Sequence, residues 1–436
     1  MNWRATHEPK GCVGAAMARI LTAEDVAAAP GKRLVLATGD RLTPLARDRA
    51  KELGVELVIA DAPAVAAPPP AAKGTDSPAP SPPAARPGSP PTARGRRSLA
   101  QPPSGALYRR NALGPARAGV APVRGGRPKA AVVGAGHVGA MTALRLAESD
   151  LFGEVALIDV VPGLAAGLAL DMWHGAGLCG FSTRIEGSDD LALLDRADYI
   201  VITAGKPRQP GMSRTDLTGV NATIVASICQ AIRQRAPDAA VVVVTNPLEE
   251  MTHVAATQTG FPDERVIGMA GVLDSARFCS LVGLTGRAQP RDVRALALGS
   301  HGPEMVIPLS QAFIGDKPIE SVLDAPTLDA IVERTRESGG EVVKLLQKGS
   351  AYFSPAESAA MMVRAMVEGT GEVIAACVRS RRAYGTSDTR VGLPVRLGRR
   401  GVREIVSLPL RREEQQALQE AAARIAARID ELGKLT

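Results

Sequence analysis

Residues 129–139 read KAAVVGAGHVG, an apolar run that leads directly into three glycines with the spacing G-x-G-x-x-G. A short apolar run bounded by glycine predicts a buried strand over Ala130–Val133, followed by a helix. Glycines at such a junction permit a tight turn and let the backbone approach a pyrophosphate at the positive end of the helix. The stretch predicts a dinucleotide-binding turn, although a glycine-rich turn in another kind of α/β sheet has the same spacing.

Apolar strands and helices alternate from here onward. The next strands are predicted at Val155–Asp159, Tyr199–Thr203 and Ala240–Thr245, and the last helix, which is amphipathic, at Arg412–Leu435. Continuous apolar strands joined by helices indicate a parallel sheet that is covered on both faces. We therefore expect an α/β fold with a Rossmann-type parallel sheet that begins at residue 129.

Asp159 ends the second predicted strand, about 20 residues beyond the glycines, where a carboxylate binds the ribose 2′-hydroxyl of a dinucleotide. The same charge would repel a 2′-phosphate, so the predicted cofactor is NAD rather than NADP. The cofactor-binding residues predicted from this part of the chain are Gly134, Ala135, Gly136, His137, Val138, Gly139 and Asp159.

Residues 1–61 are predicted to form a separate small α/β module. A helix begins near Thr22, a strand covers Arg33–Thr38, a second helix covers Thr43–Leu53 and a second strand covers Val55–Ala60. About forty residues in this pattern give only a marginal core, so we expect the module to dock on a partner.

Residues 62–128 have the composition of a disordered linker. About half of the 33 prolines fall here, together with ten Lys or Arg residues and a single acid, Asp76. Such a segment buries too little apolar surface to offset its ordering entropy, and it is expected to be an extended spacer. A segment at 105–118 is the exception that could fold on a partner. Because the linker accounts for the net charge of +7, no nucleic-acid partner is expected.

Composition excludes several other classes of protein. No apolar run approaches the ~20 residues that cross a bilayer, and the N-terminus has no signal-peptide pattern, so we expect a cytoplasmic protein without a membrane partner. The five cysteines are scattered and form no CxxC or Cys/His spacing, so neither a disulfide framework nor a metal site is predicted.

Two segments carry candidates for acid/base chemistry. His301 lies among small residues in GSHG (299–302), and Asp274 and Arg277 lie in LDSAR (273–277). A carboxylate bonded to one ring nitrogen fixes the imidazole tautomer and stabilises the imidazolium when the other nitrogen takes a proton. Arg277 has the geometry for a bidentate contact with a substrate carboxylate. A structural histidine is the alternative interpretation for His301 taken alone.

Residues 204–214 read AGKPRQPGMSR, a loop that places Arg208 and Arg214 beyond the end of the third predicted strand. Ligands bind at that edge of parallel sheets, although a solvated basic loop fits the same composition.

Together these motifs resemble the lactate/malate dehydrogenase family, and within it the malate dehydrogenases that are similar to lactate dehydrogenases. The resemblance runs from Lys129 to about Leu432 and includes VNA (220–222) and VTNP (244–247). It implies a Rossmann-type NAD-binding domain over residues 129–270 and an α+β substrate-binding catalytic domain over 271–436. The same resemblance implies reversible, NAD-dependent oxidation of (S)-malate to oxaloacetate, and a homodimer or homotetramer. It also implies that His301 is the acid/base with Asp274 as its partner, and that Arg277 binds the C1 carboxylate.

The resemblance implies further roles for loop residues. Arg214 would polarise the substrate carbonyl when the loop closes, and Asn246 would hydrogen-bond the reacting oxygen. Arg208 stands where lactate enzymes usually carry Gln, and its charge suits the second carboxylate of a dicarboxylate substrate. The remaining cofactor contacts implied are those of Asn221, Val244, Thr245 and Asn246.

The sequence departs from the family pattern in two places. Pro303 stands where Asp usually follows His-Gly, and Glu249 stands where Asp is common after Asn-Pro-Leu. The N-terminal segment is similar to modules tethered to bacterial microcompartment enzymes, which implies a shell or enzyme partner in such a compartment. Two other functions remain open: a dehydrogenase for lactate or another 2-hydroxy acid, and a docking protein whose dehydrogenase body is inactive.

Overall fold

The computed structural model describes residues 20–21, 26–27, 33–36, 41–42, 44–59, 126–206, 214–347 and 349–433. The chain divides into two compact units, residues 1–102 and 103–436. Only the last three residues of the predicted linker, 126–128, belong to the described set. None of the helices in the described ranges is long and apolar enough to cross a bilayer.

Within its described residues, the N-terminal unit contains two pairs of parallel strands and the helix α2. Its described elements are β1 (Ile20–Leu21), β2 (Arg33–Leu36), β3 (Arg41–Leu42), α2 (Pro44–Leu53) and β4 (Glu56–Ile59). Strand β2 pairs with β4 and β1 pairs with β3. Strands β2 and β4 and helix α2 lie at the predicted positions, whereas β1 and β3, two residues each, are too short to show a periodicity. Of the helix predicted near Thr22, residues 22–25 lie outside the described residues, and Val26 and Ala27 are helical.

The second unit is built on an eleven-stranded sheet. Its parallel half, in the order β7-β6-β5-β8-β9-β10, comprises β5 (Lys129–Val133), β6 (Glu154–Ile158), β7 (Arg184–Ser188), β8 (Tyr199–Ile202), β9 (Ala240–Val243) and β10 (Val266–Gly268). Numbered along the chain this is the order 3-2-1-4-5-6, in which the connections reverse direction between β5 and β8. The predicted Rossmann-type sheet is therefore confirmed. The ends of the four predicted strands are shifted by one or two residues, and β7 and β10 were not predicted.

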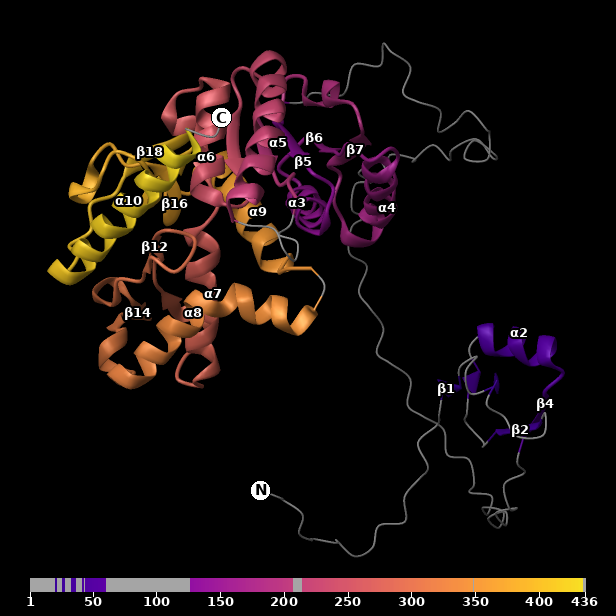
Figure 1. Cartoon of the computed structure of the whole chain (residues 1–436). Coiled ribbons are helices and arrows are strands. Elements are labelled where there is room, and N and C mark those ends of the chain that lie inside the picture. Colours follow the sequence, from indigo (N-terminus) through magenta and orange to yellow (C-terminus); the bar gives the residue numbers. More distant parts are fainter. Residues whose placement is uncertain are drawn as a thin grey trace, which may run out of the picture. The chain divides into compact units, whose positions relative to one another are not determined.

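Successive residues of the central strand face opposite sides of the sheet, so two separate cores form. Val132 packs with helices α3 (His137–Glu148), α4 (Leu164–Cys179) and α9 (Phe353–Glu368). Ala131 and Val133 pack with α5 (Arg214–Arg235) and α6 (Leu248–Thr259) on the other side. Figure 1 shows α5 and α3 on opposite sides of β5. Alanine and β-branched residues fill the strands, which accounts for a core with few aromatic side chains.

The antiparallel half of the sheet continues from β10 through β16, β17 and β12 to β13, and β18 pairs with β17. These strands are β12 (Leu298–Gly299), β13 (Met305–Val306), β16 (Val373–Arg379), β17 (Arg390–Gly398) and β18 (Gly401–Ile405). A third core lies beside them, between α7 (Gly271–Leu284), α8 (Ala325–Leu346) and a small sheet of β11 (Val293–Arg294), β14 (Phe313–Ile314) and β15 (Lys317–Pro318). Helix α10 (Arg412–Leu432) packs its apolar stripe on β17 and α6.

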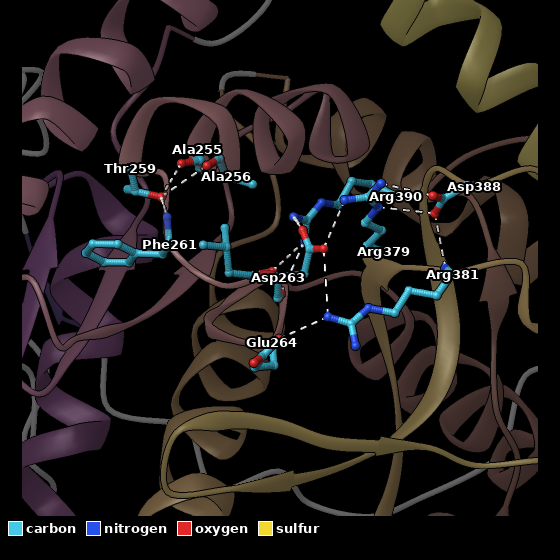
Figure 2. Close-up of polar contacts among 11 residues, drawn as sticks. Ala255, Ala256, Thr259, Phe261, Asp263, Glu264, Arg379, Arg381, Asp388 and Arg390 are labelled. Atoms are coloured by element: carbon cyan, nitrogen blue, oxygen red, sulfur yellow. Dashed lines mark hydrogen bonds and ion pairs between the residues drawn. The ribbon is translucent and has the colours of Figure 1, made fainter.

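A buried ion pair joins the two halves of the sheet. Arg390 on β17 is 4 % exposed, and its guanidinium donates to Asp263 Oδ1 at 2.6 Å and to the Val266 carbonyl at 2.8 Å. Asp263 also accepts from Arg379 at 3.1 Å, and Arg381 pairs with Glu264 beside it (Figure 2). Because Arg390 is almost out of contact with water, its partners determine whether this charge is tolerated.

We expect Arg390→Met to lower the free energy of unfolding by about 2–4 kcal/mol, because it removes a buried charge-assisted contact and leaves the Val266 carbonyl without its donor. Arg424→Met is the matched control, since Arg424 makes an exposed i,i+4 pair with Glu420 on α10. It should cost no more than about 0.5 kcal/mol. Urea unfolding followed by circular dichroism measures both, and equal losses would contradict the buried role of Arg390.

Candidate active site

The glycine turn lies at the point where the strand order reverses. Gly134 has a φ of +107°, which favours glycine, and a Cβ at Gly139 would overlap the Gly134 carbonyl oxygen. A Cβ at Gly136, in contrast, would have no atom within 4 Å. Gly139 is thus required for close packing of α3 on the turn, while the surface at Gly136 is open to a ligand.

The residues at this turn fit a dinucleotide. Gly136 caps α3 without a side-chain hydrogen bond, so the N–H groups of the first helical turn are directed at the open space. Asp159 follows β6, and its two carboxylate oxygens accept from the Ala135 N–H at 2.6 Å and the Val161 N–H at 3.0 Å. Each oxygen keeps a lone pair for a ribose hydroxyl. His137, the first residue of α3, is exposed and lies 5.0 Å from the Tyr352 ring between centroids.

Asn221 connects the loops that follow β8 and β9. Its side chain is buried, accepts from the Lys206 N–H at 2.8 Å and donates to the Asn246 carbonyl at 2.7 Å. Thr245 Oγ1 donates to the Ala204 carbonyl at 2.7 Å, which joins the same two loops. Val244 is half-buried and the side chain of Asn246 is exposed. The structure therefore brings these predicted cofactor residues together at the carboxyl edge of the sheet.

His301 and Asp274 form a close pair. Asp274 lies in the first turn of α7 and is 1 % exposed, and its Oδ2 is 2.7 Å from Nδ1 of His301 in the loop after β12. Arg277, one turn further along α7, donates to Asp274 Oδ1 at 3.1 Å. With Nδ1 engaged, Nε2 is the ring nitrogen left for proton exchange with a substrate.

Tight packing of α7 against the sheet makes this contact possible. Gly271, the first residue of α7, has no room for a Cβ because the Ala297 carbonyl occupies that position. Ser275 Oγ accepts the Ala297 N–H at 2.9 Å, one helical turn further on. These two contacts hold the start of α7 beside β12, and they bring residues 27 positions apart in the sequence together.

The surroundings of His301 favour its protonated form. Burial by itself lowers the pKa of the imidazole, but the charge and hydrogen bond of Asp274 raise it, helped by Glu249, and the net direction is upward. A raised pKa means that the pair stabilises the folded protein most at low pH and that this contribution is lost as the pH rises through the pKa. The pair therefore provides a proton donor that stays charged at a pH where free histidine loses its proton.

Glu249 is a site residue that the motifs did not assign. Its carboxylate is buried and accepts the backbone N–H of His301 at 2.6 Å. Only its departure from the family pattern distinguished it in the sequence, because the contact joins residues 52 positions apart. Pro303, the other departure, is exposed in the turn that follows His301.

Two predicted residues are not placed. Arg208 lies outside the described residues, and Arg214 begins α5 but its side chain is not among the described ones. In the ranges that are described, no group of three or more His, Cys, Asp or Glu side chains could hold a metal ion.

Two family models match the second unit. The lactate/malate dehydrogenase NAD-binding domain matches residues 128–268, and the lactate/malate dehydrogenase α/β C-terminal domain matches 271–435. Among similar proteins, a malate dehydrogenase of Thermomicrobium roseum is 43% identical over 310 residues, which are 71% of this chain and 100% of that protein.

Solved structures agree with these matches. A malate dehydrogenase from Salinibacter ruber is 36% identical with a TM-score of 0.67, covering 70% of this chain and 98% of that one. A lactate dehydrogenase from Cryptosporidium parvum, complexed with lactic acid and nicotinamide adenine dinucleotide, is 32% identical with a TM-score of 0.67 and covers the same shares.

The pairing of Asp274 with His301 predicts a measurable pKa change. In Asp274→Asn the burial of His301 is no longer opposed by a charged partner, so the pKa should fall by about one unit or more. Histidine NMR titration measures it, since the chain has five histidines and His301→Gln identifies the resonance. Asp329→Asn, an exposed position on α8, is the control and should leave the titration unchanged. An unshifted pKa in Asp274→Asn would exclude the dyad.

Proposed function

The chain belongs to the lactate/malate dehydrogenase family, and we propose that it catalyses the reversible, NAD-dependent oxidation of (S)-malate to oxaloacetate. The observation that carries the proposal is the 2.7 Å contact of His301 with buried Asp274, with Arg277 one turn away. These three groups supply an acid/base and a carboxylate-binding cation at the edge of a dinucleotide-binding sheet.

His301 moves the proton. In malate oxidation the neutral imidazole takes the proton of the C2 hydroxyl at Nε2, and Asp274 stabilises the resulting imidazolium through Nδ1. In oxaloacetate reduction His301 begins protonated and returns that proton to the carbonyl oxygen. Bound NAD supplies the hydride acceptor for the oxidation, and Asp159 favours it over a cofactor with a 2′-phosphate.

The substrate is held by arginines. Arg277 has guanidinium donors beyond the one given to Asp274, and these bind the C1 carboxylate in a bidentate contact. By resemblance, Arg208 binds the second carboxylate and Arg214 polarises the reacting carbonyl, with Asn246 as a further donor. Asn221 contributes by bracing the two loops that contact the cofactor.

A 2-hydroxy acid with one carboxylate, such as lactate, is the second candidate substrate. A similar solved structure is a lactate dehydrogenase with bound lactic acid, so the scaffold accommodates either chemistry. Arg208 favours the dicarboxylate, because leaving a second carboxylate unpaired in a closed site is costly. The third function, a docking protein with an inactive body, is disfavoured by the intact pairing of His301 and Asp274.

We also propose that the enzyme is a homo-oligomer whose partner subunit covers α4. This helix and the turn before it expose large apolar side chains that a second copy would bury. The most exposed of them are Val160 at 88 %, Leu178 at 93 % and Leu170 at 55 %.

The N-terminal module is proposed to direct the enzyme to a partner, which in a host with microcompartments is a shell or enzyme component.

Arg208→Gln tests the substrate assignment. It should lower kcat/KM for oxaloacetate by an amount equivalent to about 2–4 kcal/mol, the loss of a charge-assisted pair, while pyruvate reduction holds steady or rises. Arg233→Gln, an exposed position on α5, is the matched control and should change neither rate. Steady-state assays with NADH measure both substrates, and an equal loss on both would exclude Arg208 as the discriminating residue.

Removing the first 123 residues tests the independence of the catalytic part, since a whole malate dehydrogenase matches the remainder of this chain. A chain beginning at Arg124 should keep kcat within about twofold and the same oligomeric state, because domains fold as separate units. Light scattering and NADH oxidation measure these properties.

In the native host the full chain should co-sediment with a larger assembly and the shortened chain should not. Identical fractionation would contradict the docking role, and loss of activity would place the module in the catalytic body.

A further inference from the structure

The backbone of the catalytic histidine is held by a buried carboxylate that belongs to neither the dyad nor the substrate site. Glu249 is 3 % exposed at the start of α6, and its Oε1 accepts the His301 N–H at 2.6 Å. A carboxylate is rarely kept away from water unless it serves a partner, because its desolvation is costly. This hydrogen bond is short, and it holds the backbone of the residue that exchanges the proton with the substrate.

A second set of polar contacts restrains Ser300, the residue before His301. Ser300 Oγ donates to Glu304 at 2.8 Å, and Arg428 on α10 contacts Glu304 at 3.3 Å and Glu250 at 3.1 Å. Helix α6 therefore contributes Glu249 to His301 directly and Glu250 to the cation that fixes Glu304. The two consecutive loop residues are restrained from α6 and α10, whereas Asp274 restrains only the ring.

Several charged groups surround His301, and they affect one another's pKa. From α7, His301 faces Asp274 and Arg277, and from α6 it faces Glu249, which itself faces Glu250 and the buried thiol of Cys377 on β16. Burial raises the pKa of Glu249, the N–H and the positive charge of protonated His301 lower it, neighbouring Glu250 raises it again, and the net direction is upward. The Glu249 charge in turn raises the pKa of His301. Each charged form favours the other.

We propose that Glu249 is a positioning residue for the proton transfer: it fixes the backbone of His301 relative to Asp274, and its negative charge stabilises the imidazolium. The inference rests on the proposed dehydrogenase function. The step it assists is the transfer of the malate C2 hydroxyl proton to His301 Nε2, in which the O–H bond breaks and an N–H bond forms. Glu249 itself exchanges no proton with the substrate.

Glu249→Gln tests the charge, because the amide keeps an acceptor oxygen of nearly the same shape. We expect kcat for oxaloacetate reduction at neutral pH to fall about tenfold, with the Kd for NADH unchanged within about twofold. Reduction needs protonated His301, so its rate is lost as the pH rises through that pKa. With the Glu249 charge removed, the midpoint should move down by about half a unit or more. Malate oxidation, which needs neutral His301, should begin at a correspondingly lower pH.

Glu249→Asp keeps the charge but shortens the reach, so its pH midpoint should stay within about 0.3 unit of wild type while kcat falls. Glu249→Asp also tests the proposal if Glu249→Gln fails to fold. An unchanged kcat in Glu249→Asp would overturn the proposal, and so would a shift of the pH midpoint as large as that expected for Glu249→Gln. Glu431→Gln, exposed at the end of α10, is the control for a distant charge. A loss of rate in Glu249→Gln with an unmoved midpoint would show a merely structural role.

Histidine NMR titration of His301 without substrate separates this inference from the proposed function. A wild-type chain that turns over neither malate nor oxaloacetate would remove the proposed function, whatever Glu249 does. Even in that case, the pKa of His301 should fall in Glu249→Gln and should keep its wild-type value in Glu431→Gln. If both variants titrate like wild type while the wild-type enzyme is active, the role of Glu249 is excluded and the function stands.

Discussion

The contact between Asp274 and His301 is the constraint on which the rest of the site depends. A carboxylate that is 1 % exposed has lost its contact with water, and its polar partners must replace that solvation, so the ring, Arg277 and the carboxylate must be held together by the fold. The sheet does this through one row of its register, in which Gly268, Cys377, Gly392 and Gly299 lie side by side on four strands. Helix α7 starts at one end of that row and the His301 loop starts at the other.

Local patterns in the sequence predicted four of the six strands in the parallel half of the sheet, but not β7 or β10. The glycine turn and the strands near it were predicted within one or two residues, because each buried strand is a continuous apolar run flanked by glycine or a helix start. The antiparallel half was predicted only as an α+β domain without its strands. Strands such as β12 and β13 are two residues long, and pairing across the sheet creates them rather than any periodicity of their own.

The residues of the candidate site were also only partly predictable from the sequence. His301, Asp274 and Arg277 stand in short motifs that could be recognised, and the structure places them in contact. Glu304 and Arg428 carry no motif, and Glu249 was noted only as a departure from one, since the contacts of all three depend on which elements pack together. Arg208 and Arg214 remain predictions from the loop sequence. Chemistry that is concentrated in one segment can be found in a sequence, whereas supporting contacts from distant helices need the fold.

The position of Arg428 in the chain has a consequence for the order of events during synthesis. This side chain is made 124 residues after Glu304 and 178 residues after Glu250, the two acids that it joins. Chains emerge from the ribosome with their N-terminal parts first. The two acids are therefore made well before the cation that joins them, and the restraint on the Ser300–Glu304 contact is complete only once α10 has been made.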